Sequence, residues 1–564
     1  MPPTLQATEE DGLLDAGTKS AGPSKTVFTG YVFTINFMMG AGVLAVPHAV
    51  VAGGWGIASI FAIVINLFAL MTFFWLAEVQ ARAAILRNAL KLDFVSSADY
   101  KNSSDINDEH AELAPTKYGP MNTPYPTDLV PGPRAIQGSD DPSIPDDWSE
   151  IRSDNLMEVG EMSEIWAGRA GKTAWSVIVL LFQGAVMWVY AVVWSESVLL
   201  IVPVPGITKR LECNANTPTL STHCVHGIYV IFGVLVVLMV PFVSRNWSFM
   251  HIVQKFLIVM CYVSTIAMIV TSIIGMATAP YSKENAVGYM PPTAAPNMTL
   301  VPPTMAPANA TGPYIHKLPF AKFSGFAEVF GNLVLVCIGQ QGAALLMREM
   351  PLDKVRKTYS LAFGTITIWL MLLGIVVALY MGDATNPLVT LNFADYDQWG
   401  WKNAGGTIVG TIIALYPVCS TSAAYMLNIK NMAEAIERMF PMSWKERMSQ
   451  KWCHREYRDG LMFPFQVPLR YGLILFSVGL SFATYQFEKA LSVAGLFGFF
   501  IFFFAPVGLQ IMSQRRLHQL GLPSKTRYDT PIISHPASAI FIAVVGLAGL
   551  VYYIVKRLVP QFTA

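Results

Sequence analysis

The sequence predicts an all-α membrane protein with about eleven transmembrane helices. Hydrophobic residues make up 53% of the 564 residues and charged residues only 13%, whereas roughly a quarter of a soluble domain is charged. A hydropathy window of about 19 residues finds a series of separate apolar stretches of spanning length. In hydrocarbon each stretch must satisfy its own backbone hydrogen bonds, so each is expected to be a helix.

The predicted spans follow one another along the chain, and two long polar segments separate some of them. The spans are expected at Val27–Val51, Trp55–Val79, Thr173–Val204, His226–Val243, Lys255–Ala277, Phe323–Leu346, Tyr359–Met381, Gly405–Ile429, Tyr471–Gln486, Ala490–Met512 and Ala537–Val555. The chain therefore divides into an N-terminal tail 1–26, the first two spans in 27–81, a loop 82–172, the remaining spans in 173–556 and a tail 557–564.

The distribution of basic residues predicts that the N-terminal tail is cytosolic. With this orientation the cytosolic segments carry 29 of the 38 Lys and Arg residues, as the positive-inside rule requires. The polar residues 1–26 lack the apolar core of a signal peptide, and the tail 557–564 is expected on the luminal or extracellular side. The net charge of +1 gives no basic field for nucleic acid, which leaves the lipid bilayer as the expected surroundings.

The outer loops carry candidate modification sites. Cys213 and Cys224 share the loop before the fourth span, where an oxidising compartment would favour a disulfide between them. Asn297 and Asn309 begin two Asn-x-Thr sequons in the Pro-rich loop after the fifth span, so both are candidate glycosylation sites. The alternatives are two free thiols and sequons that occur by chance in a polar loop.

The loop 82–172 is rich in Asp, Pro, Ser and Asn at its centre, a composition typical of disorder. Its last part changes character, because apolar Val159, Met162 and Trp166 alternate with glutamates. This pattern predicts a short amphipathic helix near 157–168 that lies on the inner membrane surface. The alternative is an ordinary turn that leads into the third span.

Two of the predicted spans are interrupted where a spanning helix should be continuous. The first carries Gly-Ala-Gly and a proline in its middle, and the sixth carries Gly-Gln-Gln-Gly. Membranes tolerate such breaks where the freed backbone groups face a cavity or a ligand. Breaks at corresponding points of two five-span halves predict an inverted-repeat transporter with a binding site at the midplane. The candidate substrate-binding residues are Met39, Gly40, Ala41, Gly42, Gly339, Gln340, Gln341 and Gly342.

The ends of broken helices suit a zwitterion. The N-terminus of a half-helix presents unpaired N–H groups and a positive dipole to a carboxylate, whereas exposed carbonyls at a C-terminal end favour a cation. This chemistry predicts an amino acid that is carried together with a coupling ion. For either Gly-containing break taken alone, close packing between helices is the alternative.

Oxygen ligands for a coupling cation are predicted next to the first break and in the eighth span. Asn36 lies one helical turn before Gly40, and its amide needs a partner in hydrocarbon. Ser420 and Thr421 follow Tyr416-Pro417, where a disrupted helix frees carbonyls beside hydroxyls. These residues form a candidate sodium site. The alternative for each hydroxyl is a bond to a preceding carbonyl of its own helix.

A proton is the other candidate coupling ion. His48 could titrate near neutrality as a proton relay, and a hydrogen bond between helices is the alternative. Glu78, Glu196 and Glu328 fall near span ends, where solvated carboxylates are expected. The chain contains no metalloprotease, phosphate-loop or hydrolase motif, so we expect neither enzymatic activity nor a cofactor beyond the coupling ion.

The first span resembles the signature of the amino acid/auxin permease family, within the amino acid-polyamine-organocation superfamily. In that family Asn, Gly-x-Gly, Leu and often Pro recur with the spacing found from Asn36 to Pro47. Within it, the chain resembles the transmembrane protein 104 group through Met157–Met162, Thr390–Ala394 and Tyr416-Pro417. The resemblance implies a fold of the leucine-transporter type, a 5+5 inverted repeat with broken helices 1 and 6.

The same resemblance implies roles for individual residues. The segment Gly40–Gly42 would hold the substrate backbone, and Asn36 with Ser420 or Thr421 would occupy the sodium-site positions. One position departs from the pattern, because Cys419 stands where sodium-coupled members often have Arg. The choice between Na⁺ and H⁺ is therefore left open.

An acidic dileucine pattern, formed by Glu9 with Leu13 and Leu14, predicts recognition by cytosolic sorting adaptors. It favours the endosomal, lysosomal or vacuolar membrane, with the plasma membrane as the alternative. Taken together, the sequence predicts a secondary active transporter of amino acids or related small zwitterions, coupled to Na⁺ or H⁺ and working by alternating access. The alternative is a membrane nutrient sensor with a transporter-like fold, which binds its ligand without transporting it.

Overall fold

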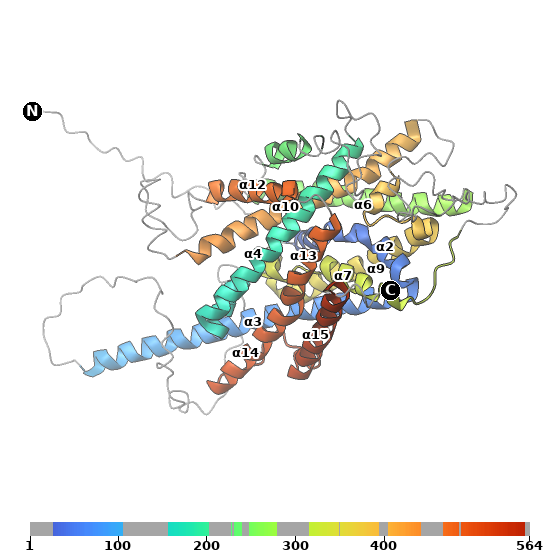
Figure 1. Ribbon diagram of the computed structural model, residues 1–564. Helices are drawn as coiled ribbons and strands as arrows, with labels where there is room; N and C mark the ends of the chain where they lie inside the picture. The colour runs from blue at the N-terminus through green and yellow to red at the C-terminus, as the bar shows by residue number, and fades with distance from the viewer. Residues whose placement is uncertain are drawn as a thin grey trace, which may run out of the picture.

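The computed structural model describes residues 26–104, 156–201, 227, 230–239, 247–278, 315–348, 350–393, 404–440, 466–483 and 487–558. All regular elements in these ranges are helical (Figure 1). Within the described residues, length and hydropathy identify eight helices that could cross a membrane, or nine when the bent pair Val27–Met38 and Gly42–Gly53 counts as one span. The chain is therefore a multi-pass integral membrane protein.

Two shorter apolar helices coincide with the other predicted spans. They are Val230–Met239, within the predicted fourth span, and Pro468–Phe482, which overlaps the predicted ninth span but begins three residues before it. In the described part of the chain, both helices are too short to cross a bilayer on their own. The total of about eleven spans thus stays a prediction, while the helical class and the membrane location are confirmed.

The chain contains long helices and, at the breaks, short helical segments. Their bounds are α1 Val27–Met38, η2 Ala41–Ala45, α2 Val46–Gly53, α3 Trp55–Ser104, α4 Val159–Ile201, α6 Trp247–Thr278, α7 Phe326–Val336, η7 Gln340–Gly342, α8 Ala343–Arg348, α9 Val355–Met381, α10 Ala404–Met439, α12 Gln466–Ala483, α13 Phe487–Phe499, η11 Phe500–Phe504, α14 Ala505–Gln519 and α15 Pro536–Leu558. Short 3₁₀ turns precede or follow several of them: η6 Phe323–Gly325, η8 Leu352–Lys354, η9 Gly382–Ala384 and η10 Val389–Phe393.

Helix α3 is much longer than the predicted second span. Its 50 residues correspond to about 75 Å of helix, whereas the hydrocarbon core of a bilayer is about 30 Å thick. The sequence analysis began a loop at residue 82, but residues 82–92 are rich in Ala, Leu, Arg and Lys, which are strong helix formers. The helix therefore continues beyond the span (Figure 1), and the rest of the predicted loop, 105–155, lies outside the described residues.

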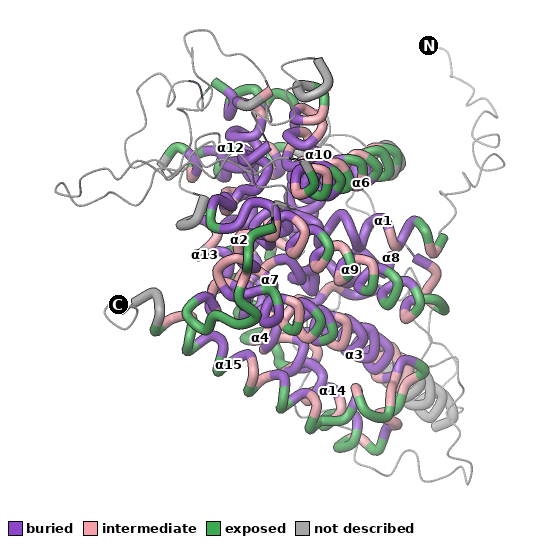
Figure 2. Tube along the Cα trace, turned by 90° about the vertical axis from the view of Figure 1, so that its right-hand side faces the viewer, coloured by how far each residue is buried: buried purple, intermediate pink, exposed green. Residues whose placement is uncertain are grey.

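Apolar side chains exposed on α6 and α15 mark the surfaces that face lipid. Each set recurs at helical spacing along one side of its helix, as a lipid-facing stripe requires. The exposed residues are Ile252, Phe256, Val259, Val263, Ile266, Val270 and Ile273 on α6, and Ile540, Phe541, Val544, Leu547 and Val551 on α15. Figure 2 shows these outer helices in green and pink around the buried segments of α1, α2 and α7.

The segment before the long part of α4 is buried in the protein. Met157, Val159 and Met162 belong to the main core. The Gln80 side chain of α3 donates to the Met157 carbonyl and accepts from the Met157 N–H. The sequence predicted that this amphipathic segment lies on the membrane surface. Its apolar face instead packs against other helices of the protein. The segment joins the rest of α4 at Gly168, where φ is +71°.

Candidate functional site

The first predicted span is broken at the expected place. Helix α1 ends at Met38, Gly40 is extended with φ −79° and ψ −161°, and the chain continues as η2 and then α2. The two halves, Val27–Met38 and Gly42–Gly53, meet at an angle of 58°. Pro47 lies in the first turn of α2, where its missing N–H leaves no helical hydrogen bond unmade. The break thus follows from glycine and proline in the sequence.

The sixth predicted span is broken as well. Helix α7 ends at Val336, and the chain passes through Gly339 into the short helices η7 and α8. The Gln340 side chain stabilises this turn, because its Oε1 accepts from the Gly339 N–H at 2.9 Å and its Nε2 donates to Thr72 Oγ1 of α3 at 3.0 Å. Gln340 is therefore bound to the scaffold, in contrast to its neighbour Gln341.

The two breaks contact each other and neighbouring helices so closely that a residue larger than glycine would require its neighbours to shift. A Cβ on Gly42 would lie 3.0 Å from Cγ2 of Val336, at the end of α7. A Cβ on Gly342 would lie 2.7 Å from the Phe37 ring of α1. A Cβ on Gly40 would lie 2.5 Å from the Tyr190 hydroxyl of α4. Two segments about 300 residues apart in the chain are thus packed backbone against side chain.

A cavity lies between the broken segments and α4, α10 and α13. Its space for the centres of water-sized molecules is about 30 Å³, enough for a few waters at most. Apolar side chains form most of its wall, among them Phe182, Val186, Leu335 and Leu491, and no residue that lines it is charged. We call it the central cavity. In this conformation it must widen before it can hold an amino acid.

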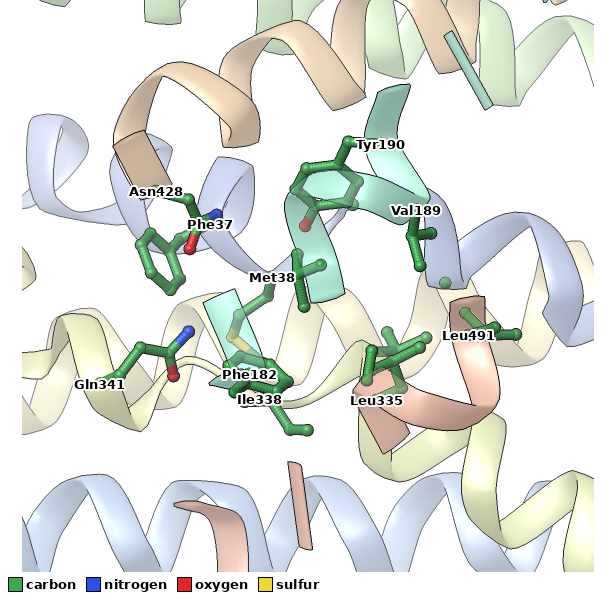
Figure 3. Close-up of a pocket in the computed structure, with 15 residues that line it drawn as sticks. Phe37, Met38, Phe182, Val189, Tyr190, Leu335, Ile338, Gln341, Asn428 and Leu491 are labelled. Atoms are coloured by element: carbon green, nitrogen blue, oxygen red, sulfur yellow. The ribbon is translucent and has the colours of Figure 1, made fainter. Parts of the chain in front are cut away.

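Three polar side chains reach the central cavity. They are Tyr190, Gln341 and Asn428, from α4, η7 and α10. Figure 3 shows the amides of Gln341 and Asn428 on one side of the cavity and Leu335 and Leu491 on the other. Gln341 Oε1 and Asn428 Oδ1 are buried and have no hydrogen-bond partner among the described residues. The cavity thus has an apolar side and a side with unpaired polar oxygens.

The candidate sodium ligands each have hydrogen bonds within the protein. Asn36 Nδ2 donates to the backbone and side-chain oxygens of Gln254 in α6, at 2.9 and 2.7 Å. The Gln254 amide donates in turn to the Ala423 carbonyl of α10 at 3.0 Å, so Asn36 joins three helices. Ser420 and Thr421 both donate to the Pro417 carbonyl, which is the helix-internal alternative considered above. The shared sodium site remains a prediction.

His48 forms a hydrogen bond between helices. Its Nδ1 lies 2.6 Å from Oε1 of Glu328, which joins α2 to α7, and both side chains are about one-third exposed. Glu328 is therefore partly solvated, as expected for a carboxylate near a span end. For Glu78 and Glu196 the same expectation is wrong, because both residues are buried. The proton relay at His48 stays a prediction.

Glu78 is buried in an ionic network that the sequence analysis missed. Arg82 Nη2 lies 3.1 Å from both Glu78 Oε2 and Asp529 Oδ1, and its Nη1 donates to Gln510 Oε1 at 2.7 Å. The network joins α3 to α14 and to the segment between α14 and α15. The available signal was the spacing of Glu78 and Arg82, since an acid and a base four residues apart lie on one helix face.

Several predicted sites lie outside the described residues. The structure describes neither the candidate disulfide nor the candidate glycosylation sites, and the dileucine pattern lies in the undescribed N-terminal part. The residues concerned are Glu9, Leu13, Leu14, Cys213, Cys224, Asn297 and Asn309.

No protein-family model matches the chain, and no curated protein matches it significantly.

Proposed function

We propose that the protein is a secondary active transporter of amino acids or related small zwitterions. The observation that supports the proposal is the meeting of two broken membrane helices at one cavity. Irregular backbone in hydrocarbon is tolerated where it lines such a cavity. Breaks in the first and sixth spans are the arrangement of an inverted-repeat carrier of the leucine-transporter type, as the resemblance to amino acid/auxin permeases implies.

The ends of the half-helices supply the binding chemistry. The N-terminal end of η2 and α2, beginning at Gly40, has no side-chain cap and suits a carboxylate. The C-terminal end of α7, at Val336, carries the negative end of the helix dipole, which suits an ammonium group or a coupling cation. In the proposed cycle, the spans containing α1 to α3 and α7 to α9 rock against the others, so that the cavity opens to each side in turn.

Uptake by purified protein in liposomes tests the proposal. A panel of labelled amino acids is offered under an imposed Na⁺ gradient, an imposed pH gradient, or neither. We expect at least one amino acid to accumulate above its outside concentration when one of the two gradients is present, which also identifies the coupling ion. Binding without accumulation under any gradient would reject the transporter and favour the nutrient sensor.

A further inference from the structure

A second cavity lies at the end of the molecule where α4 begins and α10 ends, on the predicted cytosolic side. Like the central cavity, it has about 30 Å³ of space for the centres of water-sized molecules, room for a few waters. Glu158, Ser176, Val179 and Asn431 line it. Gln341 also lines it, and Gln341 is the one residue that the linings of the two cavities share.

Helix α4 runs past both cavities. Ser176 and Val179 line the second cavity, whereas Phe182 and Val186 line the central one. Gln183 follows Val179 by four residues and precedes Val186 by three, so it lies on the same helix face between the two cavities. Helix α10 repeats this arrangement, since Asn428 lines the central cavity and Asn431 the second. The boundary between the cavities is therefore rich in amides.

The amides at this boundary are buried and incompletely paired. Gln183 is fully buried, and neither its Oε1 nor its Nε2 has a hydrogen-bond partner among the described residues. Gln341 and Asn428, exposed by only 9% and 2%, each have an unpaired oxygen. Unpaired buried polar atoms cost free energy, and in a membrane helix apolar side chains would pack there at lower cost. Because Gln341 and Asn428 also line a cavity, their unpaired oxygens are available to a ligand that enters it.

We propose that Gln183, Gln341 and Asn428 form an amide gate through which a neutral amino acid passes between the central and the second cavity. The inference rests on the proposed transport function and adds the substrate class and the route. An amide both donates and accepts, so it can bind an ammonium group and a carboxylate without carrying charge. A substrate with a charged side chain would lose its hydration in a central cavity that offers no countercharge.

Residues 156–161, just before α4 and at its start, border the second cavity. Glu158 and Gly160 belong to its lining, and the backbone of Met157 is held by Gln80 of α3. Arg348 at the end of α8 also donates to the Leu156 carbonyl, at 3.4 Å. This segment thus connects α3 and α8, both next to the breaks, with the exit of the gate. Opening the route requires these contacts to rearrange.

The test compares uptake and thermal stability in proteoliposomes and detergent for Gln341→Leu, Gln183→Leu and wild type. The probes are labelled L-alanine, L-leucine, L-glutamine, L-glutamate and L-lysine. Wild type should accumulate one or more of the first three and neither of the last two. Each Leu variant should lose about tenfold in uptake rate, the effect of removing one net hydrogen bond to the substrate, without a fall in Tm.

Two further variants exclude a merely structural effect. Ser272→Ala removes another unpaired buried group, on α6 and outside both cavities, and should leave uptake unchanged. Gln341→Asn keeps an amide and should retain more uptake than Gln341→Leu. Uptake in Gln341→Leu and Gln183→Leu at the wild-type rate, or a parallel fall in Tm and uptake in both Gln341 variants, would overturn the gate.

The outcomes separate the gate from the transporter itself. Wild-type uptake of glutamate or lysine as fast as leucine would overturn the neutral substrate class and leave the carrier intact. If wild type accumulates no amino acid under any gradient, the proposed function fails, and the gate fails with it.

Discussion

The polar groups around Arg82 and those around the central cavity are both buried, yet their hydrogen bonding differs. Arg82 is fully buried and donates to Glu78 and Asp529, each at 3.1 Å. Gln510 and Ser534 also donate to Glu78, and Arg82 Nε donates to the Ser524 carbonyl. At the cavity, oxygens of Gln341 and Asn428 have no partner in the described part of the chain. One region is fully paired, and the other retains unpaired groups.

This difference suggests that the Arg82 network, which we call the brace, stabilises the fold, whereas the polar groups at the central cavity serve to bind a ligand. In a paired ionic network, removal of one member leaves the others charged and buried, so stability falls sharply. An unpaired amide already bears its desolvation cost, and an apolar replacement of similar size costs little. Replacing a polar side chain by an apolar one should therefore lower stability sharply around Arg82 and only slightly at the central cavity.

The largest effect is expected for Arg82→Met. The substitution leaves the buried Glu78 carboxylate without its cation, which should lower the free energy of unfolding by about 3–5 kcal/mol. Thermal unfolding of the purified protein in detergent measures the change. Lys172→Met is the matched control, because the Lys172–Glu164 pair is about one-third exposed and should be worth at most about 1 kcal/mol. Equal losses in both variants would contradict the assignment of the brace.

Gly40→Ala tests the close packing at the first break. The added Cβ would meet the Tyr190 hydroxyl at 2.5 Å, so we expect overpacking of about 1–3 kcal/mol and a loss of uptake. Tyr190→Phe in the same chain removes the hydroxyl and should restore part of the stability. Thermal unfolding of the single and double variants gives the coupling between the two positions. Independent effects would show that Gly40 is needed for another reason.

A smaller change in stability is expected for Asn428→Leu. Because the Asn428 oxygen is unpaired, the free energy of unfolding should change by less than about 1 kcal/mol in either direction. Uptake of neutral amino acids should nevertheless fall, since the side chain lines the central cavity. Unfolding curves and uptake rates on the same preparations measure both quantities. A large loss of stability with normal uptake would make Asn428 part of the scaffold.

The smallest effect is expected for His48→Gln. The bond to Glu328 is about one-third exposed at both ends, and such pairs contribute at most about 1 kcal/mol. Uptake driven by a pH gradient should persist in this variant if the pair only joins α2 to α7. Selective loss of pH-driven uptake, with uptake down a substrate gradient retained, would instead identify His48 as a proton relay.

The sequence was sufficient to predict the helical membrane class and the two breaks. Glycine and proline at Gly40, Gly42, Pro47 and Gly339 have a direct meaning for the backbone in hydrocarbon, so the interruptions could be located before the structure was known. The length of α3 was underestimated, because residues beyond 82 are polar enough to resemble a loop although they favour a helix.

The contents of the site could not be predicted in the same way. Gln183 occurs in an apolar stretch with no sign of what it faces, and Asn36 meets Gln254 across 218 residues of chain. Such contacts depend on how helices pack, and hydropathy and spacing do not specify it. The brace around Arg82 was missed for the same reason, since Asp529 lies far from α3 in sequence.

Gly168 sets the angle between the first residues of α4 and the rest of the helix, although no other group packs against it. A Cβ built on this residue would meet no other heavy atom within 4 Å, so space imposes no demand for glycine. The demand comes from its positive φ, which side-chain-bearing residues adopt only at a cost. A substitution here would remove no side-chain contact. It would nevertheless change the angle between residues 159–167, which border the second cavity, and the rest of α4.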